Sequence, residues 1–353
     1  MTEDVMTDHT SDIEMREFAQ VLDRVFAASR GDDHRSVDPA RLDRELWSTL
    51  VELGVTRLTG PESEGGAEAG WAEASHLLIG SGSAAAAVPI VENDLLAGWL
   101  LQLSQSDRIV TGPTAIRTAA VLDPDGCAVN VPWARAADSI VVLWERDRAH
   151  WVAEIAGADV EVTENVNLAG EPRDHIRVDL SRINGYFVAS GVGIEFQRRG
   201  ALARALTMAG AMQRVVELVV EHTTARTQFG RPLGRFQAVQ HMVANIAAES
   251  ALTRAAAEAA VSASERFGFD SAQAGFAIAA AKSCAGHAAS AVVRDAHQCL
   301  GAIGFTAEHE LHRHTNRLLA WRSEFGSVHY WDAMLLDGAI DTGPSGLWPM
   351  ITD

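Results

Sequence analysis

The chain has 353 residues, of which 47% are hydrophobic and 22% charged, a composition typical of a globular protein with more than one domain. Its 47 acidic residues against 29 basic ones give a formal charge of −18, which argues against nucleic acid as a partner because phosphate contacts dominate such binding. The three cysteines are too scattered for a disulfide scaffold, and the 13 histidines lack a ligand spacing, so we expect no metal.

The N-terminus carries no sign of a targeting segment. It is acidic and lacks the basic and apolar regions of a signal peptide. No apolar run approaches the length of a membrane span. We therefore expect a cytoplasmic protein without a membrane partner.

The first 108 residues carry the three- and four-residue apolar spacing of helices. Helices are expected from Asp12, from Pro39 to Leu53, from Trp71 to Gly80 and near Leu95–Leu103. The loop Leu58–Gly66 between them is rich in glycine and proline. None of these residues carries identifiable chemistry, and we interpret residues 1–108 as a helical N-terminal domain.

The pattern changes over residues 109–192, where short β-type runs alternate with turn signals. Strands are expected at 119–122, 139–144, 150–155, 160–163 and 176–180. The turns between them include Asp-Pro-Asp-Gly and Ala-Gly-Ala-Asp. We interpret this region as a small, mostly antiparallel β domain.

Residues 193–353 return to helical spacing, and we expect a C-terminal domain of four packed helices. Two long helices at 200–226 and 236–267 form a hairpin. The polar run Asp270–Gln273 then has the spacing of a helix start and leads a helix to Cys299. Beyond this helix, His309, His312 and His314 cluster around charged residues on an expected helix, and we interpret them as part of a solvated face.

The corner between the two long helices is the most specific stretch of the chain. It runs from Glu221 to Gln237, and we expect Gly230 to close the first helix with a positive φ. Arginines at a helix end can simply complement the helix dipole. Here Arg226, Gln228 and Phe229 place a guanidinium, an amide and an aromatic ring within four residues, which suits an anionic, planar ligand.

The string Arg226-Thr-Gln-Phe-Gly-Arg-Pro-Leu, followed by Phe236-Gln-Ala-Val-Gln240, resembles the signature of the acyl-CoA dehydrogenase family. In that family the arginine and phenylalanine of the corner contact the FAD of a neighbouring subunit. The segment Gln298–Phe305 is similar to the family's Gln-x-x-Gly-Gly-x-Gly-Phe segment, which contacts the adenine half of FAD. The resemblance therefore implies an FAD site formed by Arg226, Gln228, Phe229, Gln237, Gln298, Gly301 and Ala302, where Ala302 replaces a glycine.

The resemblance extends over nearly the whole chain and implies the family's fold: a helical N-terminal domain, a β-barrel-like middle domain and a C-terminal four-helix bundle. Val131-Pro-Trp-Ala-Arg-Ala-Ala-Asp138 looks like the middle domain of a divergent bacterial group. That domain departs from the family in one respect. The Thr-Glu-Pro…Gly-Ser segment that holds the flavin has no counterpart between residues 105 and 145.

The family's reaction also needs a carboxylate base, because it removes a weakly acidic proton next to a thioester. Members place the base early in the helix before the corner or after the Gly-Phe segment. The first place reads Arg198 to Ala203 and holds no carboxylate, and Glu195 lies too early. At the second place, Glu324 can serve as the base; alternatively it pairs with Arg322 or Arg317 on a helix surface.

Three functional hypotheses follow from the resemblance. The chain acts as a flavin-dependent acyl-CoA dehydrogenase within a heteromeric α2β2 assembly, desaturating an acyl-CoA thioester that can be steroid-derived. Alternatively, it is a non-catalytic subunit that completes the FAD site of another chain, or a self-sufficient homotetramer. The implied partners are acyl-CoA, a second dehydrogenase-like subunit or another copy of this chain, and electron-transfer flavoprotein as electron acceptor.

Overall fold

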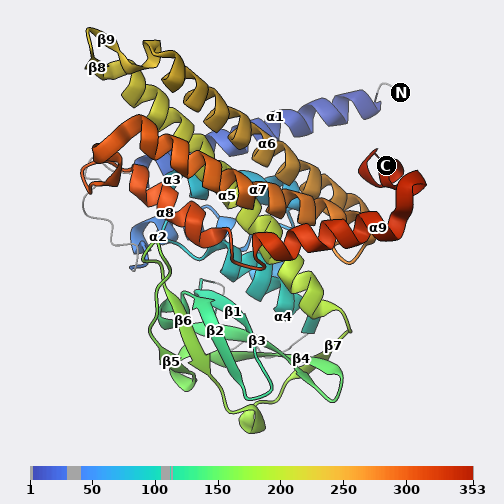
Figure 1. Ribbon diagram of the computed structural model, residues 1–353. Helices are drawn as coiled ribbons and strands as arrows, with labels where there is room; N and C mark the ends of the chain where they lie inside the picture. The colour runs from blue at the N-terminus through green and yellow to red at the C-terminus, as the bar shows by residue number, and fades with distance from the viewer. Residues whose placement is uncertain (1–2, 30–40, 105–111, 113, 353) are drawn as a thin grey trace.

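The computed structural model describes residues 3–29, 41–104, 112 and 114–352, with side chains from residue 15 onward except 350 and 352. Long helices form the upper part of the molecule, and a β domain lies at one end beneath them (Figure 1). The mainly helical fold with a small β middle domain is confirmed. The expected boundary at residues 108 and 109 lies outside the described residues.

The N-terminal part is helical, as its apolar spacing predicts. Helix α1 begins earlier than the expected Asp12, and the expected start of α2 at Pro39 lies outside the described residues. Asp43 caps α2, because its side chain accepts from the Leu46 amide at 2.9 Å. The elements are α1 (Glu3–Ser29), α2 (Arg44–Glu52), α3 (Trp71–Ala84), the π-helix η3 (Val91–Gly98) and α4 (Trp99–Ser104).

Two sheets make up the β domain. One has the order β1-β3-β4-β7, in which only the β1–β3 pair is parallel, and the other is an antiparallel sheet of order β2-β6-β5. The sequence pattern did not predict β2 or β7. The strand expected at 176–180 begins three residues after the start of β6. The strands are β1 (Arg117–Val121), β2 (Cys127–Pro132), β3 (Ser139–Arg146), β4 (Ala149–Ala156), β5 (Glu161–Thr163), β6 (Arg173–Arg177) and β7 (Tyr186–Val188).

Strand β3 is buried on both faces, which explains its continuous apolar run. Ile140, Val142 and Trp144 pack into a small core between the two sheets. The alternate residues Val141 and Leu143 belong to the main core, which continues into the helices. The β domain is thereby joined to the helical domains through a shared apolar face.

The C-terminal region is a helical bundle in which α5 packs against α6, α7 and α8. The expected start of α7 is confirmed, because Ser271 caps it by accepting from the Ala274 amide at 3.1 Å. The hairpin strands β8 (Thr227–Gln228) and β9 (Arg231–Pro232) form the corner between the first two helices. The helices are α5 (Val192–Ala225), α6 (Gln237–Phe267), α7 (Ala272–Leu300), α8 (Leu311–Trp321) and α9 (Val328–Thr352).

Helices α3 and α5 approach each other through glycines. A Cβ on Gly82 would lie 1.9 Å from the Thr207 carbonyl oxygen, and one on Gly210 would lie 1.9 Å from the Ile79 carbonyl oxygen. Neither position accepts a side chain without movement of a backbone. This contact fixes the N-terminal domain against the bundle.

Residues Ala272–Phe305 are long and apolar enough to cross a membrane, contrary to the expectation from sequence. The stretch consists of α7 and the turn that follows it. More than half of its most apolar window is buried against the rest of the protein. A core helix rich in small residues has the same composition, so this feature is weak evidence for a membrane span.

Candidate functional site

The corner between α5 and α6 is a tight β-hairpin rather than a helix cap. Phe229 and Gly230 form its two-residue turn with φ values of 54° and 80°, the pattern of a type I′ turn. The expectation that Gly230 closes the preceding helix is therefore wrong. Helix α5 ends at its C-cap Arg226, which has an extended backbone.

The implied cofactor residues of the corner face solvent. Phe229 is 90% exposed, and Arg226, Gln228 and Gln237 are exposed as well. Arg231 has a different role, because its guanidinium lies 4.1 Å from the centre of the Phe236 ring. The corner thus presents a guanidinium, two amides and an aromatic ring outward.

The second implied segment lies at the end of α7. Gln298, Gly301 and Ala302 are all exposed, and Gly301 has a φ of 64° with open space around its Cα. The ring of Phe305 stacks on the ring of His297, with the two centroids 4.1 Å apart. Whether these residues bind FAD stays a prediction.

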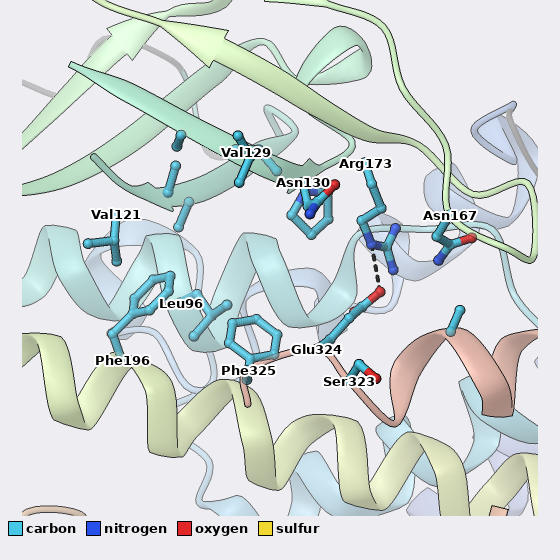
Figure 2. Close-up of a pocket in the computed structure, with 16 residues that line it drawn as sticks. Leu96, Val121, Val129, Asn130, Asn167, Arg173, Phe196, Ser323, Glu324 and Phe325 are labelled. Carbon is cyan, nitrogen blue, oxygen red and sulfur yellow. Dashed lines mark hydrogen bonds and ion pairs between the residues drawn. The ribbon is translucent and has the colours of Figure 1, made fainter. Parts of the chain in front are cut away.

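A separate pocket of about 460 Å³ lies between the β domain and the helices, and Figure 2 shows its lining. One end is apolar and contains Leu96, Val121, Phe196 and Phe325. The other end carries Asn130, Asn167, Arg173 and Glu324. Glu324 is the only carboxylate among the described residues that line this pocket.

Two arginines hold the carboxylate of Glu324. Arg173 donates through Nε to Oε1 at 2.8 Å, and Arg204 donates through Nε to Oε2 at 2.6 Å. The sequence interpretation that paired Glu324 with Arg322 or Arg317 is wrong. Arg322 donates instead to the Ser290 hydroxyl, and Arg317 to Glu171.

These pairs belong to a buried ion network that joins all three parts of the fold. Arg204 on α5 also donates to Glu92 on η3 at 2.5 Å. Arg173 on β6 contacts Glu171, which in turn accepts from Arg317 on α8 at 2.9 Å. Because buried charges are costly unless paired, each member depends on the others.

The network determines the chemistry of Glu324. Burial by itself would raise the pKa of its carboxyl, but Arg173 and Arg204 outweigh burial and lower the pKa to about 2. A general base needs a pKa near the working pH. Glu324 therefore remains ionised, with both oxygens already accepting hydrogen bonds, and is a poor proton acceptor.

The connection between the first two strands of the β domain lies outside the pocket. Strands β1 and β2 are joined by the short turn Leu122–Gly126, in which the Asp123 side chain accepts from the Asp125 and Cys127 amides. None of the residues of this turn lines the pocket. The exposed corner, with its guanidinium, two amides and aromatic ring, fits the phosphate-bearing part of the cofactor.

The corner, marked by β8 and β9, lies at the end of the bundle remote from the β domain (Figure 1), whereas residues of the β domain line the pocket. Helix α5 carries Arg204 at the pocket and ends at Arg226, about 33 Å away at 1.5 Å per residue. Side chains of the corner therefore cannot contact a group in the pocket of the same chain.

Lys282 on α7 supports the loop that carries Glu324. Its side chain is fully buried, and Nζ donates to the carbonyls of Trp321 at 3.3 Å and Arg322 at 2.8 Å. Burial is the main reason that the pKa of Lys282 is lowered to about 7. Glu324 acts against this change, and Arg204 adds to it. The lysine thus caps the C-terminus of α8.

Most of the buried ion network around Glu324 was not predicted from the sequence. Glu92, Asn93 and Asp94 are consecutive polar residues in an apolar stretch, which was a readable signal, and all three are buried. Arg173 and Arg204 gave no local signal. His314 was wrongly assigned to a solvated face, since it is 2% exposed.

Comparisons with known proteins find similarity to acyl-CoA dehydrogenases. Residues 194–328 match the family model described as acyl-CoA dehydrogenase, C-terminal domain. The acyl-CoA dehydrogenase FadE27 of Mycobacterium tuberculosis is 28% identical over 81% of this chain and 84% of its own length. The acyl-CoA dehydrogenase IpdE2 of the same organism is 28% identical over 78% of this chain and 80% of its own length.

Solved structures share the fold. The ChsE4-ChsE5 complex from Mycobacterium tuberculosis superposes with a TM-score of 0.82 at 22% identity, covering 94% of this chain and 98% of that one. The Tcur3481-Tcur3483 steroid ACAD has a TM-score of 0.81 at 20% identity, with the same coverage. At these identities the likeness describes the fold only.

Proposed function

We propose that the chain belongs to the acyl-CoA dehydrogenase family, a family of oxidoreductases, and that it is one subunit of a heteromeric, flavin-dependent acyl-CoA dehydrogenase. In this assembly its exposed corner completes the FAD site of the partner chain. Its own pocket does not carry out the desaturation. This role corresponds to the non-catalytic alternative raised by the sequence.

One observation carries the proposal: Glu324, the only carboxylate among the described residues that line the pocket, is held by Arg173 and Arg204. Proton transfer from a substrate to Glu324 would neutralise the charge that Arg173 and Arg204 share. Neutralising Glu324 would remove one charged partner from each of two buried guanidinium groups, which is costly. The pocket therefore favours a structural rather than a catalytic role for this residue.

The corner supplies binding and orientation. The exposed Arg226 can form a charge-assisted fork with a pyrophosphate, and Gln228 and Gln237 can donate amide hydrogens beside it. Phe229, which is 90% exposed, becomes buried only when a partner covers it. Flavin bound in the partner would supply the redox chemistry.

The substrate and the other partners follow from the family and the relatives. We propose an acyl-CoA thioester, and a steroid-derived one is supported by the fold shared with a structure titled as a steroid ACAD. Electron-transfer flavoprotein is the proposed electron acceptor, and the cytoplasm the proposed location. Acyl-CoA would bind at the partner's competent pocket.

The test is the flavin content of the chain purified alone and after co-expression with candidate dehydrogenase subunits. We expect no stoichiometric flavin in the chain alone and about half a flavin per chain in the assembly, because one chain of each pair holds it. Glu324→Gln should retain turnover in the assembly when assayed well below its melting temperature. One FAD per chain in a homotetramer that Glu324→Gln inactivates would overturn the proposal.

A second experiment tests the corner. Arg226→Ala should lower the flavin retained by the assembly after dialysis and leave the melting temperature of this chain unchanged, because Arg226 is exposed. Size-exclusion chromatography separates loss of flavin from loss of the partner. Unchanged flavin content would count against a role for Arg226 in cofactor binding.

A further inference from the structure

Phe325 lines the pocket beside Glu324, and its backbone has an unusual conformation. Its φ is 54°, in the left-handed region that sterics disfavour for a bulky side chain. Glycine would adopt this backbone without strain. Backbone strain of this kind often marks a functional position. The turn after α8 thus carries an aromatic ring where the backbone alone favours glycine.

Helix α5 makes room for the ring of Phe325. Gly200 lies inside this helix, where glycine is less favourable than alanine. A Cβ on Gly200 would lie 2.2 Å from Cδ1 and 2.3 Å from Cε1 of the Phe325 ring. A larger residue at position 200 would therefore displace the ring. The unfavourable choices at Gly200 and at Phe325 share one consequence, which is that the ring stands where it does.

Neighbouring side chains hold the ring and its turn. The Phe196 and Phe325 ring centroids lie 6.2 Å apart at an angle of 56°. The guanidinium carbon of Arg204 lies 5.9 Å from the centre of the Phe325 ring. Lys282 donates to the carbonyl of Gly326 at 3.5 Å, in addition to its contacts with the end of α8. The ring is therefore held from α5, and its turn is held from α7.

Within the pocket, the ring of Phe325 separates the apolar end from the carboxylate of Glu324. All of Leu96, Phe196, Phe325 and Glu324 line this pocket. In Figure 2 the Phe325 ring lies between the side chains of Leu96 and Glu324. An apolar group that binds beside Leu96 and Phe196 therefore meets the ring before it can reach Glu324.

The charged groups at the other end of the pocket are already paired. Arg173 and Glu324 bind each other, and Arg173 also donates to Glu171 at 3.2 Å. Asn167 is likewise committed, since its side-chain oxygen accepts from the amides of Ala169 and Glu171. A charged ligand would have to break these contacts or remain unpaired in a partly apolar pocket, and both are costly. The pocket therefore favours an uncharged ligand.

We propose that Phe325 determines which ligands this pocket accepts. Standing on Gly200, its ring limits them to short, uncharged, apolar groups that fit beside Leu96 and Phe196. This inference rests on the proposed function, in which the pocket does not carry out the desaturation, and deepens it. A longer chain that enters the apolar end is kept from Glu324 by the ring, so the pocket binds a small apolar group without bringing it to a carboxylate.

The test measures the binding of n-alkanols from butanol to dodecanol to the purified full-length chain, by displacement of the uncharged dye Nile red. Affinity should rise about fourfold with each methylene that finds room in the pocket and then level off. In Phe325→Gly, which suits a φ of 54° and removes the ring, it should level off at a chain longer by about two methylenes or more. Octanoate should bind more weakly than octanol to both proteins. The matched control is Phe187→Gly, at an aromatic residue of β7 that is 64% exposed and outside the pocket, and it should keep the wild-type limit.

Each outcome decides the inference. The same limiting chain length in the wild type and in Phe325→Gly would overturn it, and so would the absence of alkanol binding to both proteins or tighter binding of octanoate than of octanol. If circular dichroism shows Phe325→Gly unfolded, Phe325→Leu is measured instead and should move the limit in the same direction, because leucine is the smaller side chain. The proposed function fails separately, through stoichiometric flavin in the chain alone, whatever the alkanol titration gives.

Discussion

Replacing Glu324 by glutamine tests whether this residue serves structure or catalysis. The substitution keeps the shape of the side chain and removes the charge that Arg173 and Arg204 share. Glu324 is 17% exposed, so solvent compensates only in part. We expect a large loss of stability, because both guanidinium groups, 4% and 6% exposed, lose a charged partner.

The magnitude can be obtained in two ways. Breaking a buried ion pair by removing one partner costs about 3–5 kcal/mol. The lowering of the Glu324 pKa from 4.5 to about 2 corresponds to about 3 kcal/mol. For 353 residues with an unfolding entropy of about 2.1 cal/mol/K each, a loss of 4 kcal/mol lowers the melting temperature by about 5 °C.

The assay is thermal unfolding of the chain, followed by circular dichroism, with Glu258→Gln as control. Glu258 pairs with Arg254 on an exposed face of α6, with 51% and 43% exposure, where a single ion pair contributes about 1 kcal/mol or less. If Glu324→Gln melts within a degree of Glu258→Gln, the ion network does not stabilise the fold and our argument is wrong.

The pH dependence has a definite sign. A carboxylate whose pKa is lower in the folded than in the unfolded state stabilises the protein fully above its unfolded pKa. The contribution of Glu324 should therefore be lost as the pH falls from about 4.5 to about 2. Within this window the gap in stability between wild type and Glu324→Gln should narrow.

Two further predictions concern the helices. Burial lowers the pKa of Lys282 to about 7, so the contribution of this group to wild-type stability should rise between pH 7 and pH 10.5. Lys282→Met should therefore be more stable relative to the wild type at pH 6 than at pH 9. A urea midpoint of Lys282→Met that gains on the wild-type midpoint from pH 6 to pH 9 would contradict this. Gly210→Ala should destabilise the folded protein by about 1–3 kcal/mol, because the new methyl group would lie 1.9 Å from the Ile79 carbonyl oxygen. The control Gly338→Ala, in open space on α9, should not destabilise it. Equal urea midpoints for the two variants would show that α3 and α5 can move apart.

Local patterns determined much of this protein. The spacing of apolar residues located the long helices, because a helix that buries one face repeats with its own period. The continuous apolar run of residues 140–144 likewise indicated a strand, which proved to be buried on both faces. The corner at Arg226 could be identified because its residue types lie next to one another in the chain.

Glu324 shows the limit of such patterns. The sequence identified it as a carboxylate at a place where a base can lie, but offered as partners only the nearby Arg322 and Arg317. Its actual partners are 151 and 120 positions away, and the next link, from Arg204 to Glu92, spans 112 positions. Tertiary packing brings these charges together.

The chemistry of a carboxylate depends on what surrounds it rather than on its own identity. Glu324 in an apolar pocket would have a raised pKa and could take a proton. Between Arg173 and Arg204 it has a lowered pKa and holds three segments of the fold together. The sequence by itself determined that the residue is acidic, and only the tertiary structure decided that it is a structural ion-pair partner, because the two arginines arrive from distant parts of the chain.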